Sequence, residues 1–123
     1  MLGVGTDILS INRIKAILEH DSGSFVGRTF TVREQKAADQ RNDSVLFYAT
    51  RFAGKEAIFK CLDLDPESID LKEIEILNSP SGRPEVFFKG NLRKVLQQKG
   101  IKKVDLSLSY ENDYVLAFAM SWE

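Results

Sequence analysis

Hydrophobic positions in the first thirty residues predict a short strand followed by a helix. Residues 2–8 carry apolar side chains at strand spacing, with two glycines that permit close backbone approach. Residues 11–18 carry isoleucine and leucine at helical spacing, and Ser10 before them is a residue type that caps helix starts. We expect Gly23 and Gly27 to end this helix.

Two further helices are predicted in the first half of the chain. Thr31 followed three residues later by Glu34 is the capping-box pattern. Residues 44–62 are apolar almost all round a helical axis and are followed by the turn signal DLDP. The third helix is therefore expected to be buried.

After Pro66 the pattern changes to alternating apolar positions separated by turn residues. It predicts strands over 71–77 and 85–88, a helix between Gly90 and Gly100, and strands over 104–110 and 114–122. The last two strands are joined at Glu111-Asn112-Asp113, whose composition predicts a hairpin. Helices in the first half and antiparallel strands in the second predict an α+β fold, with helices packed on a small antiparallel sheet.

The last predicted strand is apolar on both faces, so we expect both faces to be covered. Either helices of the same chain lie on both sides, or another subunit covers one of them. Leu116, Phe118, Met120 and Trp122 fall on one face, and Val115, Ala117 and Ala119 on the other.

Length and charge narrow the classes of function. The 123 residues have room for one domain, expected over 1–123, and a net charge of −1 gives no global field for nucleic acid or an anionic membrane. Six basic residues and no acidic one lie between Lys89 and Lys103. That run is either a solvated helix face or a contact for phosphate or an acidic partner.

Cysteine and histidine chemistry has little support in this sequence. Cys61 and His20 are each the single residue of their type, which argues against a disulfide framework, a thiolate metal site or a Ser-His-Asp mechanism. There is no signal-peptide pattern at the N-terminus and no apolar stretch of membrane-spanning length. We therefore expect a cytoplasmic protein.

Four charged residues on the buried third helix are the strongest candidates for chemistry. Glu56 and Lys60 lie one above the other at helical spacing, and Arg51 and Lys55 form a second stacked pair. Charges on buried surface are costly unless they are paired, hydrogen-bonded or bound to a metal. Structural salt bridges alone would also account for these four residues.

Asp7 adds a second carboxylate, expected at the C-terminal end of the first strand. Asp7 and Glu56 together would suit Mg²⁺, which takes one or two protein carboxylates plus water and phosphate oxygens. With Arg51, Lys55 and Lys60 nearby, the set fits the phosphates of a nucleotide-like substrate.

These motifs resemble those of the holo-acyl-carrier-protein synthases, a family of 4′-phosphopantetheinyl transferases. Gly5-Thr6-Asp7 with Arg13 resembles the G-x-D-x5-R pattern of the family, and residues 51–60 resemble its R-F/W-A-x-K-E-A-x-x-K helix. Gly82-Arg83-Pro84 is similar to the family's G-x-P turn, and SLSYENDYVLAFA to its C-terminal strands. The resemblance covers nearly the whole chain in order.

The resemblance implies a role for each matched residue. Asp7 and Glu56 would bind Mg²⁺, Glu56 and Lys60 would be catalytic, and Arg13 would contact the acidic carrier protein. Coenzyme A would be held by Arg51, Lys55, Gly82, Arg83, Pro84 and Tyr110. The family fold is α+β and usually a homotrimer, with active sites between subunits.

Three positions depart from the family pattern. Phe59 stands where a serine is common, Leu62-Asp63 where a glycine often ends the helix, and Tyr110 where the final strands usually offer histidine. A tyrosine can hydrogen-bond a phosphate but does not shuttle protons near neutral pH as histidine does.

The implied reaction is transfer of 4′-phosphopantetheine from coenzyme A to a serine of apo-acyl-carrier protein, with release of adenosine 3′,5′-bisphosphate. Two other readings stay open on the sequence. One is an Mg²⁺-dependent hydrolase of a nucleotide pyrophosphate, and the other is a non-catalytic oligomeric domain that binds coenzyme A or phosphate.

Overall fold

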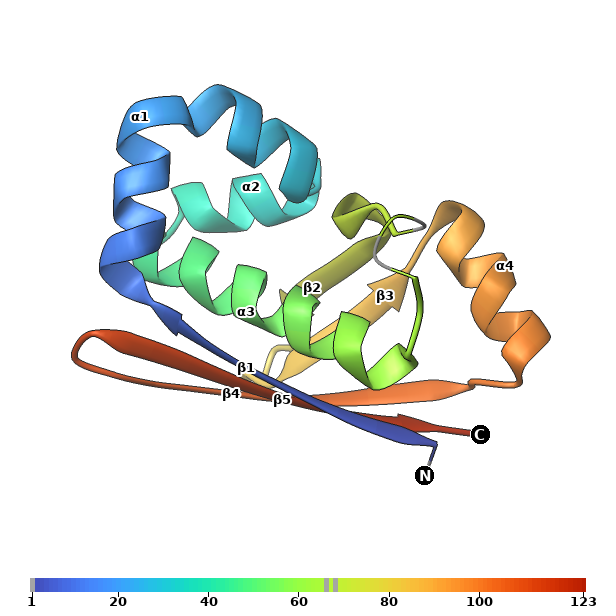
Figure 1. Ribbon diagram of the computed structural model, residues 1–123. Helices are drawn as coiled ribbons and strands as arrows, with labels where there is room; N and C mark the ends of the chain where they lie inside the picture. The colour runs from blue at the N-terminus through green and yellow to red at the C-terminus, as the bar shows by residue number, and fades with distance from the viewer. Residues whose placement is uncertain (1, 66, 68) are drawn as a thin grey trace.

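Helices cover one face of a three-stranded antiparallel sheet in the computed structural model, which describes residues 2–65, 67 and 69–123 (Figure 1). The strand order is β1 (Gly3–Ser10), β5 (Tyr114–Trp122) and β4 (Lys103–Glu111). The first and last strands are therefore neighbours, with Gly3 opposite Ser121 and Ser10 opposite Tyr114. The predicted α+β class is confirmed.

Helix α3 (Ser44–Leu62) lies across the inner face of this sheet, over the predicted range. It packs closely because small residues meet at the contact. The helix contributes three fully buried alanines, and β5 contributes further small side chains that are also fully buried. These residues are Ala49, Ala53 and Ala57 on α3, and Val115, Ala117 and Ala119 on β5.

Helix α1 (Ile11–Thr29) continues past the two glycines that were expected to end it. The irregularity is a kink at Asp21, with φ −151° and ψ 45°. Gly23 and Gly27 are exposed and make no close packing contact, so the helix tolerates them. The expected break was wrong because an exposed glycine weakens a helix by only about 1 kcal/mol.

Helix α2 (Val32–Asp39) begins with the predicted capping box. The Thr31 hydroxyl accepts a hydrogen bond from the Glu34 amide, and the Glu34 carboxylate accepts one from the Thr31 amide. Both groups are buried, so the box also fixes the connection between α1 and α2.

A second, two-stranded sheet lies beside the helices and consists of β2 (Ile74–Asn78) and β3 (Pro84–Phe88). Residues 71–73, predicted to begin the first of these strands, instead form the short 3₁₀ helix η2 (Leu71–Glu73), because the Asp70 side chain accepts a hydrogen bond from the Lys72 amide. Helix α4 (Gly90–Lys99) follows and ends at Gly100, which has a left-handed φ of 74°.

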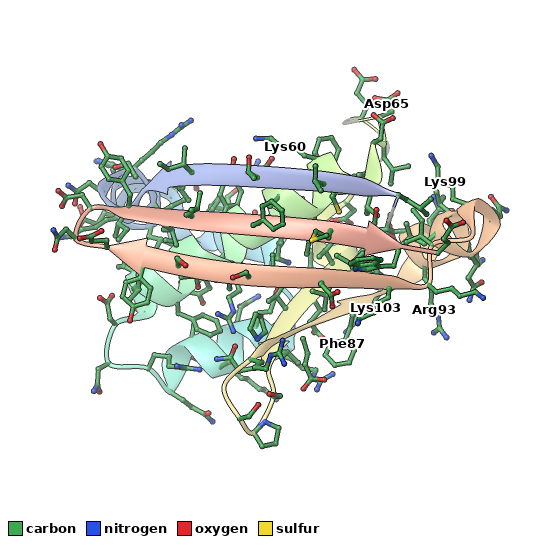
Figure 2. All side chains as sticks on the ribbon, turned by 90° about the horizontal axis from the view of Figure 1, so that it is seen from below. Lys60, Asp65, Phe87, Arg93, Lys99 and Lys103 are labelled. Atoms are coloured by element: carbon green, nitrogen blue, oxygen red, sulfur yellow. The ribbon has the colours of Figure 1, made fainter. Side chains whose placement is uncertain are left out.

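The outer face of the three-stranded sheet is not covered by any helix of the described chain (Figures 1 and 2). Four apolar side chains on it are 40–68% exposed: Val4, Ile8, Leu116 and Phe118. The alternative in which the chain's own helices cover both faces of the last strand is therefore wrong.

The predicted hairpin between β4 and β5 is confirmed, with Asn112 at φ 46° in the turn. Within the described ranges, none of the helices is both long enough and apolar enough to cross a membrane.

Candidate active site

Two glycines bring β1 against α3. A Cβ atom at Gly5 would collide with the backbone of Ala57 and Cys61, and one at Gly3 with the carbonyl of Cys61. Asp7 lies on the same face of the strand as these glycines, since side chains alternate along β1. The glycine spacing thus places the Asp7 carboxylate beside the middle turns of α3.

Asp7 meets the last turn of α3 through Lys60. The Lys60 ammonium lies 3.2 Å from Asp7 Oδ1 and donates a 3.0 Å hydrogen bond to the Thr6 carbonyl. About half of the Lys60 side chain is exposed, so it remains accessible to a ligand (Figure 2). Asp7 is not at the end of its strand as expected, because pairing with β5 continues to Ser10.

Glu56 lies one helical turn before Lys60 and is partly buried. Burial raises the pKa of the Glu56 carboxyl, the negative charge of Asp7 raises it further, and Lys60 lowers it. The carboxyl also lines a small cavity of about 190 Å³ with Phe59, Ile69 and Leu71. Phe59 therefore adds apolar surface beside Glu56 where a serine would have added a hydroxyl.

Asp7 and Glu56 together have the donor chemistry that Mg²⁺ prefers. Two carboxylates close enough for one to raise the pKa of the other are stabilised by a cation between them. Among the described residues, no cluster of three or more Asp, Glu, His or Cys side chains could hold a metal. A cation at this pair would complete its coordination with water and substrate oxygens, as Mg²⁺ commonly does.

Lys55 does not belong to this site, contrary to its expected contact with the cofactor. Its side chain is fully buried, and the ammonium donates to Glu34 Oε1 at 2.8 Å. Three backbone carbonyl oxygens, those of Thr29, Leu71 and Ile74, also lie 2.6–2.8 Å away, so four oxygens share its three N–H donors. Desolvation by burial lowers the pKa of Lys55 and the Glu34 charge raises it. Since protein oxygens surround the ammonium, this lysine is structural.

Arg51 lies on another side of α3 and lines a second cavity, of about 430 Å³. Its guanidinium donates to the Ile76 carbonyl at 3.3 Å and to Asn78 Oδ1 at 2.7 Å, and it stacks 4.1 Å from the Phe47 ring. Burial lowers the pKa of Arg51 to about 10, so the group stays charged at neutral pH. These contacts fix the guanidinium before any ligand arrives.

Three of the expected cofactor residues line this same cavity: Gly82, Pro84 and Tyr110. Gly82 has a φ of 90°, which favours glycine, and its amide donates to the Ser79 carbonyl at 2.8 Å to close the turn. Tyr110 is 63% exposed. Arg83 is also exposed but does not line the cavity.

Sequence reasoning missed Arg41 and Asn78, which also line the Arg51 cavity. Asn78 ends β2 and Arg41 precedes Asp43, whose side chain caps the start of α3. The Asp43 cap was no signal for a phosphate site, because its carboxylate occupies the Leu46 amide and is itself negative.

The remaining predicted positions lie outside both cavities. Arg13 is exposed near the start of α1. Asp63 ends α3 with a left-handed φ of 52°, the conformation that a glycine would adopt at that position. Cys61 is buried, and burial raises the pKa of its thiol to about 11, so it has no nucleophilic character at neutral pH.

Comparison with known proteins gives consistent similarities over nearly the whole chain. Residues 3–119 match the 4′-phosphopantetheinyl transferase superfamily. The holo-[acyl-carrier-protein] synthase of Desulforudis audaxviator is 38% identical over 121 residues, which cover 98% of this chain and 92% of that protein.

Solved structures agree with this similarity. The crystal structure of holo-[acyl-carrier-protein] synthase from Neisseria meningitidis superposes with a TM-score of 0.93 at 35% identity, covering 100% of this chain and 99% of that one. The Bacillus anthracis synthase, in complex with CoA (3′,5′-ADP), has a TM-score of 0.80 at 26% identity and covers 98% of this chain and 95% of that one.

Proposed function

This chain belongs to the 4′-phosphopantetheinyl transferase superfamily and to its holo-[acyl-carrier-protein] synthases, and we propose that Asp7, Glu56 and Lys60 carry out its reaction. The reaction is transfer of 4′-phosphopantetheine from coenzyme A to a serine of apo-acyl-carrier protein. One observation carries the assignment: the glycines of β1 bring Asp7 to α3 beside Glu56 and Lys60.

In this transfer the serine oxygen forms a bond to the β-phosphorus of coenzyme A. The bond from that phosphorus to the bridging oxygen breaks, and adenosine 3′,5′-bisphosphate leaves. Phosphoryl-type transfer depends mainly on positioning and on stabilising charge at the phosphate oxygens. The half-exposed Lys60 ammonium would stabilise the transferred or leaving phosphate.

Asp7 and Glu56 would hold Mg²⁺, which would neutralise charge developing on the pyrophosphate oxygens when bound. The serine proton must go to a base, and we assign the role of this base to Glu56 or to a water that Glu56 holds. Burial and the Asp7 charge raise the pKa of Glu56, and a bound Mg²⁺ would oppose this rise, so the assignment rests on the position of the carboxylate beside Asp7 and Lys60.

The cationic cavity around Arg51 would bind the phosphates of coenzyme A, with Gly82, Pro84 and Tyr110 at its wall. In one chain this cavity shares no lining residue with the small cavity at Glu56. We propose that a homotrimer joins them, with the Asp7–Glu56 half from one subunit facing the Arg51 cavity of its neighbour.

The open apolar face of the β1–β5–β4 sheet supports the trimer. Several exposed apolar side chains gathered on one face of a sheet favour an association site there. Light scattering should therefore find a trimer in solution.

Arg13, exposed on α1, would contact the acidic carrier protein. The cytoplasmic location of the protein stays a prediction.

The decisive experiment incubates the protein with apo-carrier, coenzyme A and Mg²⁺ and follows the carrier by intact-mass spectrometry. A phosphopantetheine mass increment that requires Mg²⁺ and is lost in Glu56→Gln supports the assignment. Release of nucleotide products without carrier would instead indicate a pyrophosphate hydrolase. Calorimetric binding of coenzyme A without any transfer would indicate a binding domain.

A further inference from the structure

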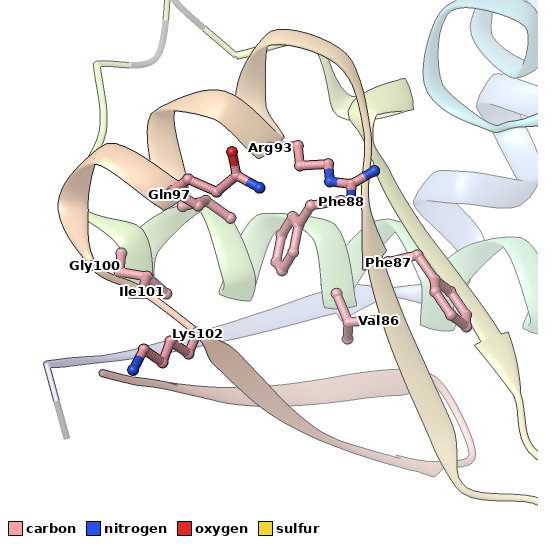
Figure 3. Close-up of a pocket in the computed structure, with 9 residues that line it drawn as sticks. Val86, Phe87, Phe88, Arg93, Gln97, Gly100, Ile101 and Lys102 are labelled. Atoms are coloured by element: carbon pink, nitrogen blue, oxygen red, sulfur yellow. The ribbon is translucent and has the colours of Figure 1, made fainter.

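A cavity of about 630 Å³ lies between α4, β3 and the start of β4, and the proposed reaction does not use it (Figure 3). It shares no lining residue with the cavities at Glu56 or Arg51. Its volume is typical of sites for small ligands. Its apolar wall comes from β3, α4 and the loop after α4, and consists of Val86, Phe88, Leu96 and Ile101.

The cavity is bordered by part of the basic run between Lys89 and Lys103. The two residues at the ends of that run have structural partners: Lys89 pairs with Glu75 at 3.1 Å and Lys103 with Asp105 at 3.3 Å. Arg93 and Lys102 line the cavity, and neither has an ion pair within the described part of the chain.

Arg93 is the better placed of these two cations to receive a ligand. Figure 3 shows its side chain extending from α4 towards β3 near Phe88, while Lys102 lies at the other end beside Ile101. A guanidinium presents parallel N–H donors that match the two oxygens of a carboxylate. An unpaired guanidinium beside an apolar wall is complementary to a molecule with one anionic head and an apolar body.

We propose that this cavity binds a single-chain amphiphile, with its carboxylate on Arg93 and its alkyl chain against the apolar wall. The occupant is a free molecule of the fatty-acid type rather than a membrane or a protein segment. The chain would lie against side chains that are already partly or fully buried, so binding needs no rearrangement of the core.

The test is isothermal titration calorimetry with octanoate, decanoate and dodecanoate below their micelle-forming concentrations. Affinity should rise roughly two- to fourfold for each methylene that reaches the wall. Dodecanol should bind at least about tenfold more weakly than dodecanoate, since it lacks the charge-assisted hydrogen bonds. Equal affinity across the chain lengths, or no binding, would overturn the proposal.

Two variants and a matched control locate the site. Arg93→Glu should weaken dodecanoate binding at least about tenfold. Lys94→Glu makes the same charge change one residue away on α4, off the cavity wall, and should change binding less than about twofold. Gln97→Trp, at the exposed mouth, should also block binding while the net charge stays constant.

Other occupants give distinct results, each of which contradicts the proposal. Equal losses in Arg93→Glu and Lys94→Glu would indicate non-specific attraction to a basic surface. Binding that occurs only to vesicles of anionic lipid would indicate a membrane contact. A change of oligomeric state in Arg93→Glu, measured by light scattering, would indicate that a second copy of the chain covers the cavity. Thermal melting should first show that each variant is folded.

Discussion

Adjacent residues of α3 face different surroundings, and this sets their roles. Lys55 is enclosed by Glu34 and three carbonyl oxygens, whereas Glu56, the next residue, lines a cavity. A step of one residue turns a side chain by about 100° around a helix. One short motif thus contains both the lysine of a buried ion pair and the carboxylate that we propose takes part in the reaction.

The enclosed lysine should matter chiefly for stability. Lys55→Met leaves the buried Glu34 carboxylate without its cation and should lower the free energy of unfolding by about 3–5 kcal/mol. Lys60→Met, on the half-exposed lysine, should cost less than about 1 kcal/mol. Urea denaturation of both variants measures this difference, and equal losses would mean that the Lys55–Glu34 pair is not a stabilising contact.

Kinetics should separate the two other cations of the helix. Lys60→Ala should lower kcat more than it raises the KM for coenzyme A, if the ammonium acts mainly in the transition state. Arg51→Lys keeps the charge but loses the planar fork that Asn78 and the Ile76 carbonyl hold, so KM should rise by about tenfold. If steady-state kinetics showed that Lys60→Ala mainly raises KM and Arg51→Lys mainly lowers kcat, the roles of the two residues would be exchanged.

Cys61 should be inert until the pH is high. Burial raises the pKa of its thiol to about 11, so thiolate is scarce in the folded protein. At pH 8 alkylation by iodoacetamide should be at least about a hundredfold slower than in urea, and it should accelerate about tenfold per pH unit up to about pH 11. Fast alkylation of the folded protein at pH 8 would show that the thiol is accessible.

At the scale of elements, the contact between β1 and α3 decides whether the site forms. Gly5→Ala places a methyl group against the Ala57 carbonyl and should destabilise the fold by about 2–3 kcal/mol, with a loss of transfer activity because Asp7 moves. Gly27→Ala, in an exposed part of α1 with open space around it, should instead stabilise the protein by about 0.5–1 kcal/mol. Thermal and urea unfolding of Gly5→Ala and Gly27→Ala measure these two changes in stability. The close approach would be refuted if Gly5→Ala were as stable as the parent.

Periodicity was sufficient for the elements whose signals are local. The limits of α3, the Thr31–Glu34 capping box and the last hairpin follow from short-range chemistry, and the structure agrees with them. The limits of α1 and β2 were wrong, because an exposed glycine did not break one helix and the Asp70 side chain stabilised a 3₁₀ turn before the strand.

The candidate site could be predicted only in part for a similar reason. The spacing of residues along the sequence indicated which side chains share a face of α3. It did not indicate which other segments of the chain pack on that face. Lys55 could not be assigned without the positions of Glu34 and the carbonyls of residues 71 and 74. Arg41 and Asn78 meet Arg51 only because β2 packs beside the start of α3.

At the scale of the whole molecule, the proposed shared site predicts complementation between inactive variants. Glu56→Gln removes one carboxylate of the metal half. Gly82→Trp should block the cofactor half, since a large side chain at a φ of 90° is both strained and obstructive. Mixed trimers would contain some interfaces with both halves intact, so activity should partly return after co-refolding.

The control for complementation is the oligomeric state and folding of each variant alone, followed by proof that subunits have exchanged. Folded, mixed oligomers that regain no activity would contradict the shared site. An active monomer in light scattering would also contradict it.

The pairing of the first strand with the last has a consequence for synthesis on the ribosome. In the described structure β1 has β5 as its single strand partner, and β5 is completed only at Trp122. The strand that carries Asp7 is translated before β5, so it has no ladder to join until the chain has been extended to Trp122. Nascent chains therefore lack a formed Asp7 site until β5 has left the exit tunnel, and catalytic competence cannot arise before that point of elongation.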